Sequence, residues 1–188
     1  MKKTAILDFT TAFKYPFNRS IGLLNILWIF LPIIGWFALG GYTIRIVQEF
    51  CKGKFSELPS FKFSQDLHLG VLMFLKSIPF ILVYGILIFI LTVLSPWIAG
   101  IVRFFLSLFV VPILTINFFT KQTIISFFEI EIIKSVFDNF VEYIIVVLKT
   151  ILLTIVFFLM WIVLVGIPAG TFTQYIFLAD FYRRKVQR

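Results

Sequence analysis

Residues 69–95 read LGVLMFLKSIPFILVYGILIFILTVLS, and residues 101–119 read IVRFFLSLFVVPILTINFF. Each stretch contains one charged residue, Lys76 in the first and Arg103 in the second. A run of about 20 predominantly apolar residues is long enough to cross the hydrocarbon core of a bilayer as a helix. The segment between them, Ser95-Pro96-Trp97-Ile98-Ala99-Gly100, contains the proline and glycine of a tight break. Together the two stretches predict a helical hairpin in a membrane.

The composition of the whole chain is that of a membrane protein. Of its 188 residues, 61% are hydrophobic and only 14% are charged, whereas soluble domains are about one quarter charged. So few charged groups could not cover a water-facing surface. The net charge of +8 could indicate a nucleic-acid partner, but the basic residues stand in short segments between apolar runs, as the positive-inside bias predicts. We therefore expect a lipid bilayer as the partner, and no nucleic acid.

Two further regions repeat the pattern of an apolar run with a Pro–Gly break. Residues 22–44 carry no charge and are interrupted at Pro32-Ile33-Ile34-Gly35. They predict either one crossing of the bilayer or a re-entrant hairpin with arms too short to span it. Residues 143–165 precede a break at 166–170 and an aromatic segment that ends near residue 182. One straight helix over 143–182 would be about 60 Å long, so the chain must turn back or lie down after Gly166.

Other segments predict helices at the membrane surface. Residues 4–20 mix aromatic and charged side chains and indicate a short interfacial segment ended by Pro16. In residues 122–142, polar and apolar side chains alternate at helical spacing, which predicts one amphipathic helix. Its polar face holds Glu131, Lys134, Ser135, Asp138 and Glu142, and its apolar face Ile133, Val136, Phe137, Phe140 and Val141. Because the polar face is acidic, we expect it to pack on basic segments of the same protein.

The distribution of basic residues favours a topology of three hairpins. In that topology every basic group except Arg103 belongs to one side of the membrane, which the positive-inside rule makes cytoplasmic. A single crossing by residues 22–44 would instead put the basic N-terminus outside. In the polar connection over residues 45–69, Gly53 predicts a helix end and Asp66 predicts the N-cap of the next helix.

No catalytic, cofactor-binding or metal-binding residue is predicted. Cys51 and His68 are the only cysteine and histidine, and they lie too far apart in sequence to form a metal motif. Ser60 has only His68 as a conceivable activating partner, and the Glu129/Glu131 pair faces two directions. Nucleotide-binding and hydrolase motifs are absent from the sequence. We therefore expect a protein that is not an enzyme and uses no cofactor.

The polar residues inside the apolar runs are interpreted as structural. Lys76, Arg103 and Lys149 lie within about two turns of a helix end, where long basic side chains can reach the headgroups. Asn25 and Asn117 are interpreted as residues that hold helices together by hydrogen bonds. Carboxylates are absent from these runs in the sequence, which disfavours proton-coupled transport.

The order of several short motifs resembles the domain-of-unknown-function 4013 family of small polytopic membrane proteins of bacteria and archaea. The motifs are Phe13-Lys14-Tyr15-Pro16-Phe17, Gly41-Tyr42-Thr43-Ile44-Arg45, Gly53 with Leu58-Pro59, Gly70, the stretch from Ser126-Phe127-Phe128 to Tyr143, and Ala179-Asp180-Phe181-Tyr182-Arg183. The resemblance covers nearly the whole chain, although Asp180 replaces an expected uncharged residue and the middle of the chain is short. It implies architecture and location, and no activity.

The chain is thus predicted to be a single integral membrane domain, residues 1–188, with an all-α fold. That fold is a polytopic transmembrane bundle with Pro/Gly-broken hairpins and interfacial amphipathic helices. The expected location is a bacterial or archaeal cytoplasmic membrane, with both termini cytoplasmic. Two function classes follow. The first is a non-enzymatic scaffold, accessory or protective (immunity) component, which acts alone or with another membrane protein or a second copy. The second is a subunit of a small-solute transporter or channel, since broken helices often build substrate sites.

Overall fold

The computed structural model describes residues 6–187, and these residues form helices without any β-strand. The α-helices are Phe9–Lys14 (α1), Ile34–Cys51 (α2), Phe63–Leu94 (α3), Pro96–Phe105 (α4), Val111–Lys121 (α5), Ile130–Asp138 (α6), Phe140–Leu159 (α7), Gly166–Thr173 (α8) and Ile176–Lys185 (α9). Four 3-10 segments, Tyr15–Phe17 (η1), Ser20–Phe30 (η2), Ile124–Phe127 (η4) and Met160–Val163 (η5), and one π-helical segment, Leu106–Val110 (η3), join them. The predicted all-α fold is confirmed.

Three helical segments are long and apolar enough to cross a membrane: Phe63–Leu94, Pro96–Lys121 and Phe140–Val163. They correspond to the runs predicted at residues 69–95, 101–119 and 143–165. In the most apolar window of each segment, only 6% to 17% of the residues are buried inside the protein. Their side chains therefore face outward, where lipid can solvate them.

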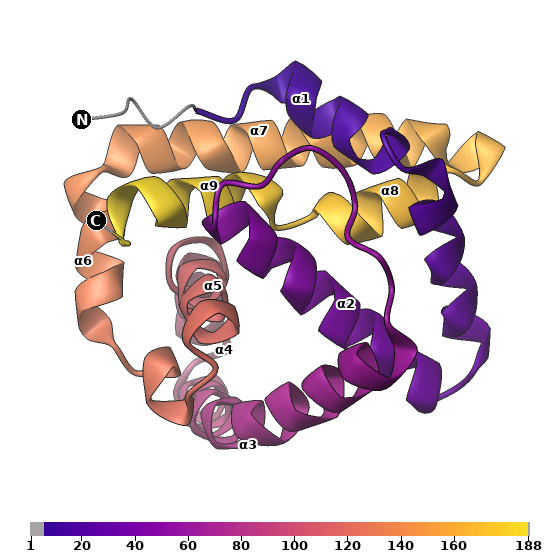
Figure 1. Ribbon diagram of the computed structural model, residues 1–188. Coiled ribbons are helices and arrows are strands. Elements are labelled where there is room, and N and C mark those ends of the chain that lie inside the picture. The colour runs from indigo at the N-terminus through magenta and orange to yellow at the C-terminus, as the bar shows by residue number, and fades with distance from the viewer. Residues whose placement is uncertain (1–5, 188) are drawn as a thin grey trace.

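The second of the predicted breaks is tighter than the sequence indicates. Only Ser95 leaves the helical conformation, with φ −162° and ψ 113°, and α4 begins at once with Pro96. Proline suits the first helical position because no helical hydrogen bond is lost there. The far part of α3 and the α4–α5 segment are seen nearly end-on in Figure 1, so this hairpin projects away from the layer that contains α2, α7 and α9.

Residues 22–44 do not form one straight helix. The η2 segment ends at Phe30, the chain reverses at Leu31–Ile33, and α2 returns along η2. Gly35 makes the reversal possible: a Cβ at this position would lie 1.8 Å from the carbonyl oxygen of Trp28. Of the two alternatives for this region, the folded-back arrangement is the one observed.

The expected reversal after α7 is confirmed, but it occurs earlier than the glycines indicate. The chain turns at Leu164, which has a φ of +58°, and at Val165. Residues 166–170 were expected to break the helix, and they instead belong to α8. Gly166 serves close packing, since its Cβ would lie 2.0 Å from the carbonyl oxygen of Phe157 in α7. Figure 1 shows α8 and α9 running back along α7.

The prediction of one amphipathic helix over residues 122–142 is wrong. This stretch is divided into η4, α6 and the first turn of α7, with a break at Asn139. The Asn139 side chain donates a hydrogen bond to the carbonyl oxygen of Ser135 (3.0 Å), and such local bonds compete with the helical pattern. Within α6, Ile132 and Val136 face the core, whereas Phe137 is exposed.

Two other boundaries illustrate local chemistry. The expected helix end at Gly53 is confirmed: α2 ends at Cys51, and Gly53 has a φ of +77°. Asp66 is not the N-cap of α3, because the helix already begins at Phe63. Its carboxylate instead accepts a hydrogen bond from the backbone N–H of Lys62 (2.7 Å), so it caps the helix from inside the first two turns.

The centre of the protein is built by α2 and α9. Helix α2 packs on α3, α5 and α9, and eight of the ten residues of α9 are buried. The N-terminal segment packs on the outside of this core: Phe13 stacks on Phe157 of α7, with ring centroids 5.6 Å apart. Pro16 lies within η1 and is buried, and residues 4 and 5 of the predicted interfacial segment lie outside the described residues.

Candidate functional site

A cavity of about 1120 Å³ lies between η2, α2, α3, α5, η4 and α8. Its lining is predominantly apolar and contains no charged side chain. The lining residues are Ile26, Ile29, Ile33, Trp36, Phe37, Leu39, Gly40, Thr43, Ile44, Gly70, Met73, Phe74, Ser77, Phe80, Ile81, Thr115, Phe118, Phe119, Phe127, Ile167, Thr171, Gln174 and Tyr175. Large apolar pockets are the default binding sites of proteins, and this one is the candidate site here.

Two neighbouring glycines give α2 two different faces. Gly40 faces the cavity, and a Cβ built there would meet nothing within 4 Å. Gly41 faces α3, where a Cβ would lie 1.8 Å from the carbonyl oxygen of Asp66 and 2.8 Å from the nitrogen of Gly70. Small residues allow such close backbone contact between membrane helices. The α2–α3 crossing fixes one wall of the cavity.

Three stacked phenylalanines form another wall. The rings of Phe80 and Phe127 stack with centroids 4.3 Å apart and an interplanar angle of 9°. Phe118 stacks on the other side of Phe127 at 4.1 Å. The three residues come from α3, η4 and α5, so the stack joins elements that are far apart in sequence.

Three of the five hydroxyl groups at the cavity are engaged by their own helices. Ser77 donates to the carbonyl oxygen of Phe74 (2.7 Å), Thr115 to that of Val111 (2.8 Å) and Thr171 to that of Ile167 (2.8 Å). These bonds satisfy the hydroxyl donors without a ligand. At these three positions the wall thus behaves chemically as an apolar surface.

Asn117 anchors the aromatic wall from behind. It is fully buried, and its amide nitrogen donates to the carbonyl oxygen of Ser126 (2.7 Å) and to Glu129 Oε2 (3.2 Å). Its amide oxygen accepts a hydrogen bond from the Tyr182 hydroxyl (2.6 Å). These bonds link α5, η4 and α9, in agreement with the interpretation of Asn117 as a residue that holds helices together. Lys121 also pairs with Glu129, and this hydrogen bond lowers the pKa of the Glu129 carboxyl.

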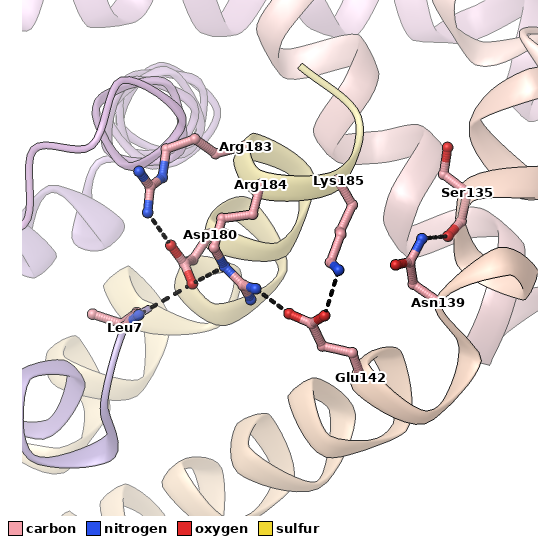
Figure 2. Close-up of polar contacts among 8 residues, drawn as sticks. All are labelled: Leu7, Ser135, Asn139, Glu142, Asp180, Arg183, Arg184 and Lys185. Atoms are coloured by element: carbon pink, nitrogen blue, oxygen red, sulfur yellow. Dashed lines mark hydrogen bonds and ion pairs between the residues drawn. The ribbon is translucent and has the colours of Figure 1, made fainter. Parts of the chain in front are cut away.

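A second polar feature is a cluster of ion pairs around Asp180 (Figure 2). The Asp180 carboxylate is buried and accepts three hydrogen bonds: from Arg183 (2.6 Å), from Arg184 Nε (2.9 Å) and from the backbone N–H of Leu7 (3.2 Å). The cluster therefore ties the N-terminal segment to α9.

Glu142 extends the cluster to α7. One of its carboxylate oxygens pairs with Arg184 and the other with Lys185 (2.7 Å) (Figure 2). Burial by itself would lower the pKa of Arg184, but the hydrogen bond to Glu142 and the charge of Asp180 raise it overall. The two acids and three bases of the cluster pair with each other. Its function in the fold is to fasten α9 against α7.

The acidic face predicted after residue 122 packs on a basic segment only at Glu142, which pairs with Arg184. Glu131 and Asp138 of that face are exposed. Of the basic residues placed in apolar runs, Lys76 donates to the carbonyl oxygen of Gln122 (2.8 Å), and Lys149 lies over the ring of Phe177. Arg103 is exposed.

The remaining candidates do not assemble into a site. His68 is exposed on α3, and the hydroxyl of Ser60 accepts a hydrogen bond from Arg19 (2.9 Å). Cys51 is buried at the end of α2, and burial raises the pKa of its thiol to about 11. Within residues 6–187, no group of three or more His, Cys, Asp or Glu side chains is placed to hold a metal ion.

Sequence reasoning missed the cavity and the Asp180 cluster. The i, i+4 spacing of Asp180 and Arg184 was a signal for part of the cluster, but the contact of Arg184 with Glu142 bridges 42 residues. The cavity has no local signal, because its walls come from six separate elements. No family model, curated protein or solved structure matches this chain, so the resemblance to the domain-of-unknown-function 4013 family stays a prediction.

Proposed function

We propose that this protein is a non-catalytic component of a membrane, with a scaffold, accessory or protective role that depends on binding within the bilayer. The observation that carries the proposal is the outward-facing apolar surface of the three candidate spans, of which at most 17% of the most apolar window is buried. The predominantly apolar, uncharged lining of the cavity supports a binding role.

The proposal is tested by extraction and by solubility. We expect the protein to stay in the membrane fraction during an alkaline carbonate wash and to need detergent for a monodisperse state. Release by carbonate, or a stable monodisperse protein in detergent-free buffer, would contradict the proposal. A protective role further predicts that deletion of the gene lowers tolerance to membrane-active peptides, and unchanged tolerance across a broad panel would count against that role.

The proposed location is a bacterial or archaeal cytoplasmic membrane, crossed more than once, with both termini cytoplasmic. The positive-inside rule supports this orientation. In a Cys51→Ala background, we expect an impermeant maleimide added to intact cells to label Trp97→Cys, at the exposed tip between α3 and α4. Ser56→Cys, in the exposed loop after α2, should react only in inverted vesicles. The opposite labelling pattern would reverse the orientation.

A transporter or channel subunit is the second candidate, and the helix break at Leu31–Ile33 together with the break at Ser95 is the observation that favours it. The apolar wall of the cavity does not favour a polar solute. Flux of a labelled solute into proteoliposomes above empty controls would support this second function and reject the first.

A further inference from the structure

We propose that the cavity bounded by η2, α2, α3, α5, η4 and α8 is a binding site for a lipid acyl chain. The inference rests on the proposed membrane function and deepens it, because it names the site and the chemical class of the ligand. Three properties of the cavity carry it: the surroundings of its mouth, the chemistry of its walls and its size.

The rim of the cavity is continuous with the apolar exterior of the protein. Five lining residues are large, apolar and about half exposed: Ile29 (47%), Ile33 (63%), Trp36 (58%), Phe74 (48%) and Ile81 (52%). Two of them belong to α3, whose next turns continue with exposed Leu82 and Val83. In a membrane, the medium that meets such a rim is the acyl region of the bilayer.

The walls select an apolar ligand over a polar one. The lining contains no charged side chain, and Ser77, Thr115 and Thr171 already donate to carbonyl oxygens of their own helices. A polar solute would lose its hydration and gain few hydrogen bonds in return. An acyl chain has no polar group and therefore loses no hydration when it enters the cavity.

The size and rigidity of the cavity fit a chain that remains in place. Its volume of about 1120 Å³ slightly exceeds the roughly 300–1,000 Å³ typical of ligand pockets. Hydrophobic transfer does not drive a chain from lipid into an apolar pocket, so retention depends on van der Waals contacts with fixed walls. The stacked rings of Phe80, Phe118 and Phe127 provide such a wall.

Gly40 provides a direct way to fill the cavity. A side chain at this position enters open space in the cavity, since nothing lies within 4 Å of the Cβ position. Gly85, in the exposed part of α3, also has open space at its Cβ but does not line the cavity. Gly40→Phe and Gly85→Phe therefore form a matched pair with one aromatic ring added inside or outside the cavity.

The experiment uses the full chain in vesicles of phosphatidylethanolamine and phosphatidylglycerol. One arm contains a trace of phosphatidylcholine with a diazirine on its acyl chain, and a second arm contains a free diazirine fatty acid. After irradiation, mass spectrometry compares labelling of cavity peptides around Phe118 and Phe127 with labelling of exterior peptides around Phe89. The two arms distinguish a phospholipid chain from a free fatty acid as the source.

We expect both cavity and exterior peptides to be labelled in the unmodified protein. Gly40→Phe should reduce labelling of the cavity peptides by about tenfold, which corresponds to a loss of about 1.4 kcal/mol in binding free energy, and should leave the exterior peptides unchanged. Gly85→Phe should leave the cavity peptides unchanged. Labelled exterior peptides with unlabelled cavity peptides, or cavity labelling that Gly40→Phe does not reduce, would overturn the acyl-chain site and leave the proposed membrane function standing. Without labelling of either set, the proposed membrane function would fail as well.

Discussion

Replacing Gly41 by alanine should destabilise the protein through the α2–α3 crossing. The added Cβ would lie 1.8 Å from the carbonyl oxygen of Asp66, and real Cβ contacts stay beyond 3.0 Å, so the two helices must separate by about 1.2 Å at this point. Both obstructing groups, Asp66 and Gly70, are backbone and cannot rotate away. The same shift would lengthen the Arg45–Asp66 ion pair, which is 2.7 Å long.

The expected cost follows from this geometry. Overpacking costs about 1–3 kcal/mol, and the backbone clash places Gly41→Ala near the upper limit, at about 3 kcal/mol. For a chain of this length, about 1 kcal/mol changes the melting temperature by about 2–4 °C. We therefore expect a decrease of roughly 6–12 °C in a thermal unfolding experiment in detergent, followed by tryptophan fluorescence.

Gly40→Ala is the matched control, because it adds the same methyl group one residue earlier in the same helix. Nothing lies within 4 Å of its Cβ, and the restriction of the unfolded chain should stabilise the protein by about 0.4–1 kcal/mol. The reasoning would be refuted if Gly41→Ala melted within 2 °C of the unmodified protein, with roughly 1 kcal/mol or less lost, or if both variants lost stability equally.

Three further predictions concern buried polar groups. Because burial raises the pKa of Cys51 from 9.0 to about 11, its thiolate population near neutral pH should be about one hundredth of that of an exposed cysteine. N-ethylmaleimide should therefore react slowly with the folded protein and rapidly after denaturation. Equally fast alkylation of both states would contradict this prediction. Asp180→Asn should destabilise the protein by about 3–5 kcal/mol, because two arginines then lose a buried counter-charge. The control is Glu131→Gln at an exposed position, which should change stability by less than about 0.5 kcal/mol. Equal melting temperatures of the two variants would argue against a structural role for the cluster. Asn117→Ala leaves the buried Tyr182 hydroxyl without its acceptor, so the unfolding free energy should fall by about 1–3 kcal/mol. A denaturation midpoint equal to that of the unmodified protein would show that the hydrogen bond is dispensable.

The elements predicted best are those specified by local composition. The apolar runs at residues 69–95 and 143–165 correspond to α3 and α7, since a long apolar segment has few alternatives to a helix in lipid. The chain reversal near Pro32 could also be predicted from the sequence, because proline and glycine mark positions where a helix breaks.

The sequence was less informative wherever a side-chain contact decides the outcome. Helix α3 starts at Phe63 because Asp66 reaches back to the backbone of Lys62, and α6 ends where Asn139 bonds to Ser135. Periodicity alone continues through both positions.

The candidate site was least predictable. Gly40 and Gly41 cannot be distinguished in the sequence. Only the position of α3 makes Gly40 a cavity residue and Gly41 a helix contact. The cavity could not be foreseen, because six separate elements have to be placed before its volume exists.

The central position of α9 has a consequence for biosynthesis. Cys51 of α2 contacts Ala179 of α9 across 128 residues of sequence, and ribosomes add about 5–20 residues per second. The face of α2 that receives α9 therefore stays uncovered for about 6–26 s after α2 has been made. During that interval the nascent protein depends on the insertion machinery or on surrounding lipid to shield this face, and any mutation that delays the docking of α9 extends its exposure to quality-control proteases.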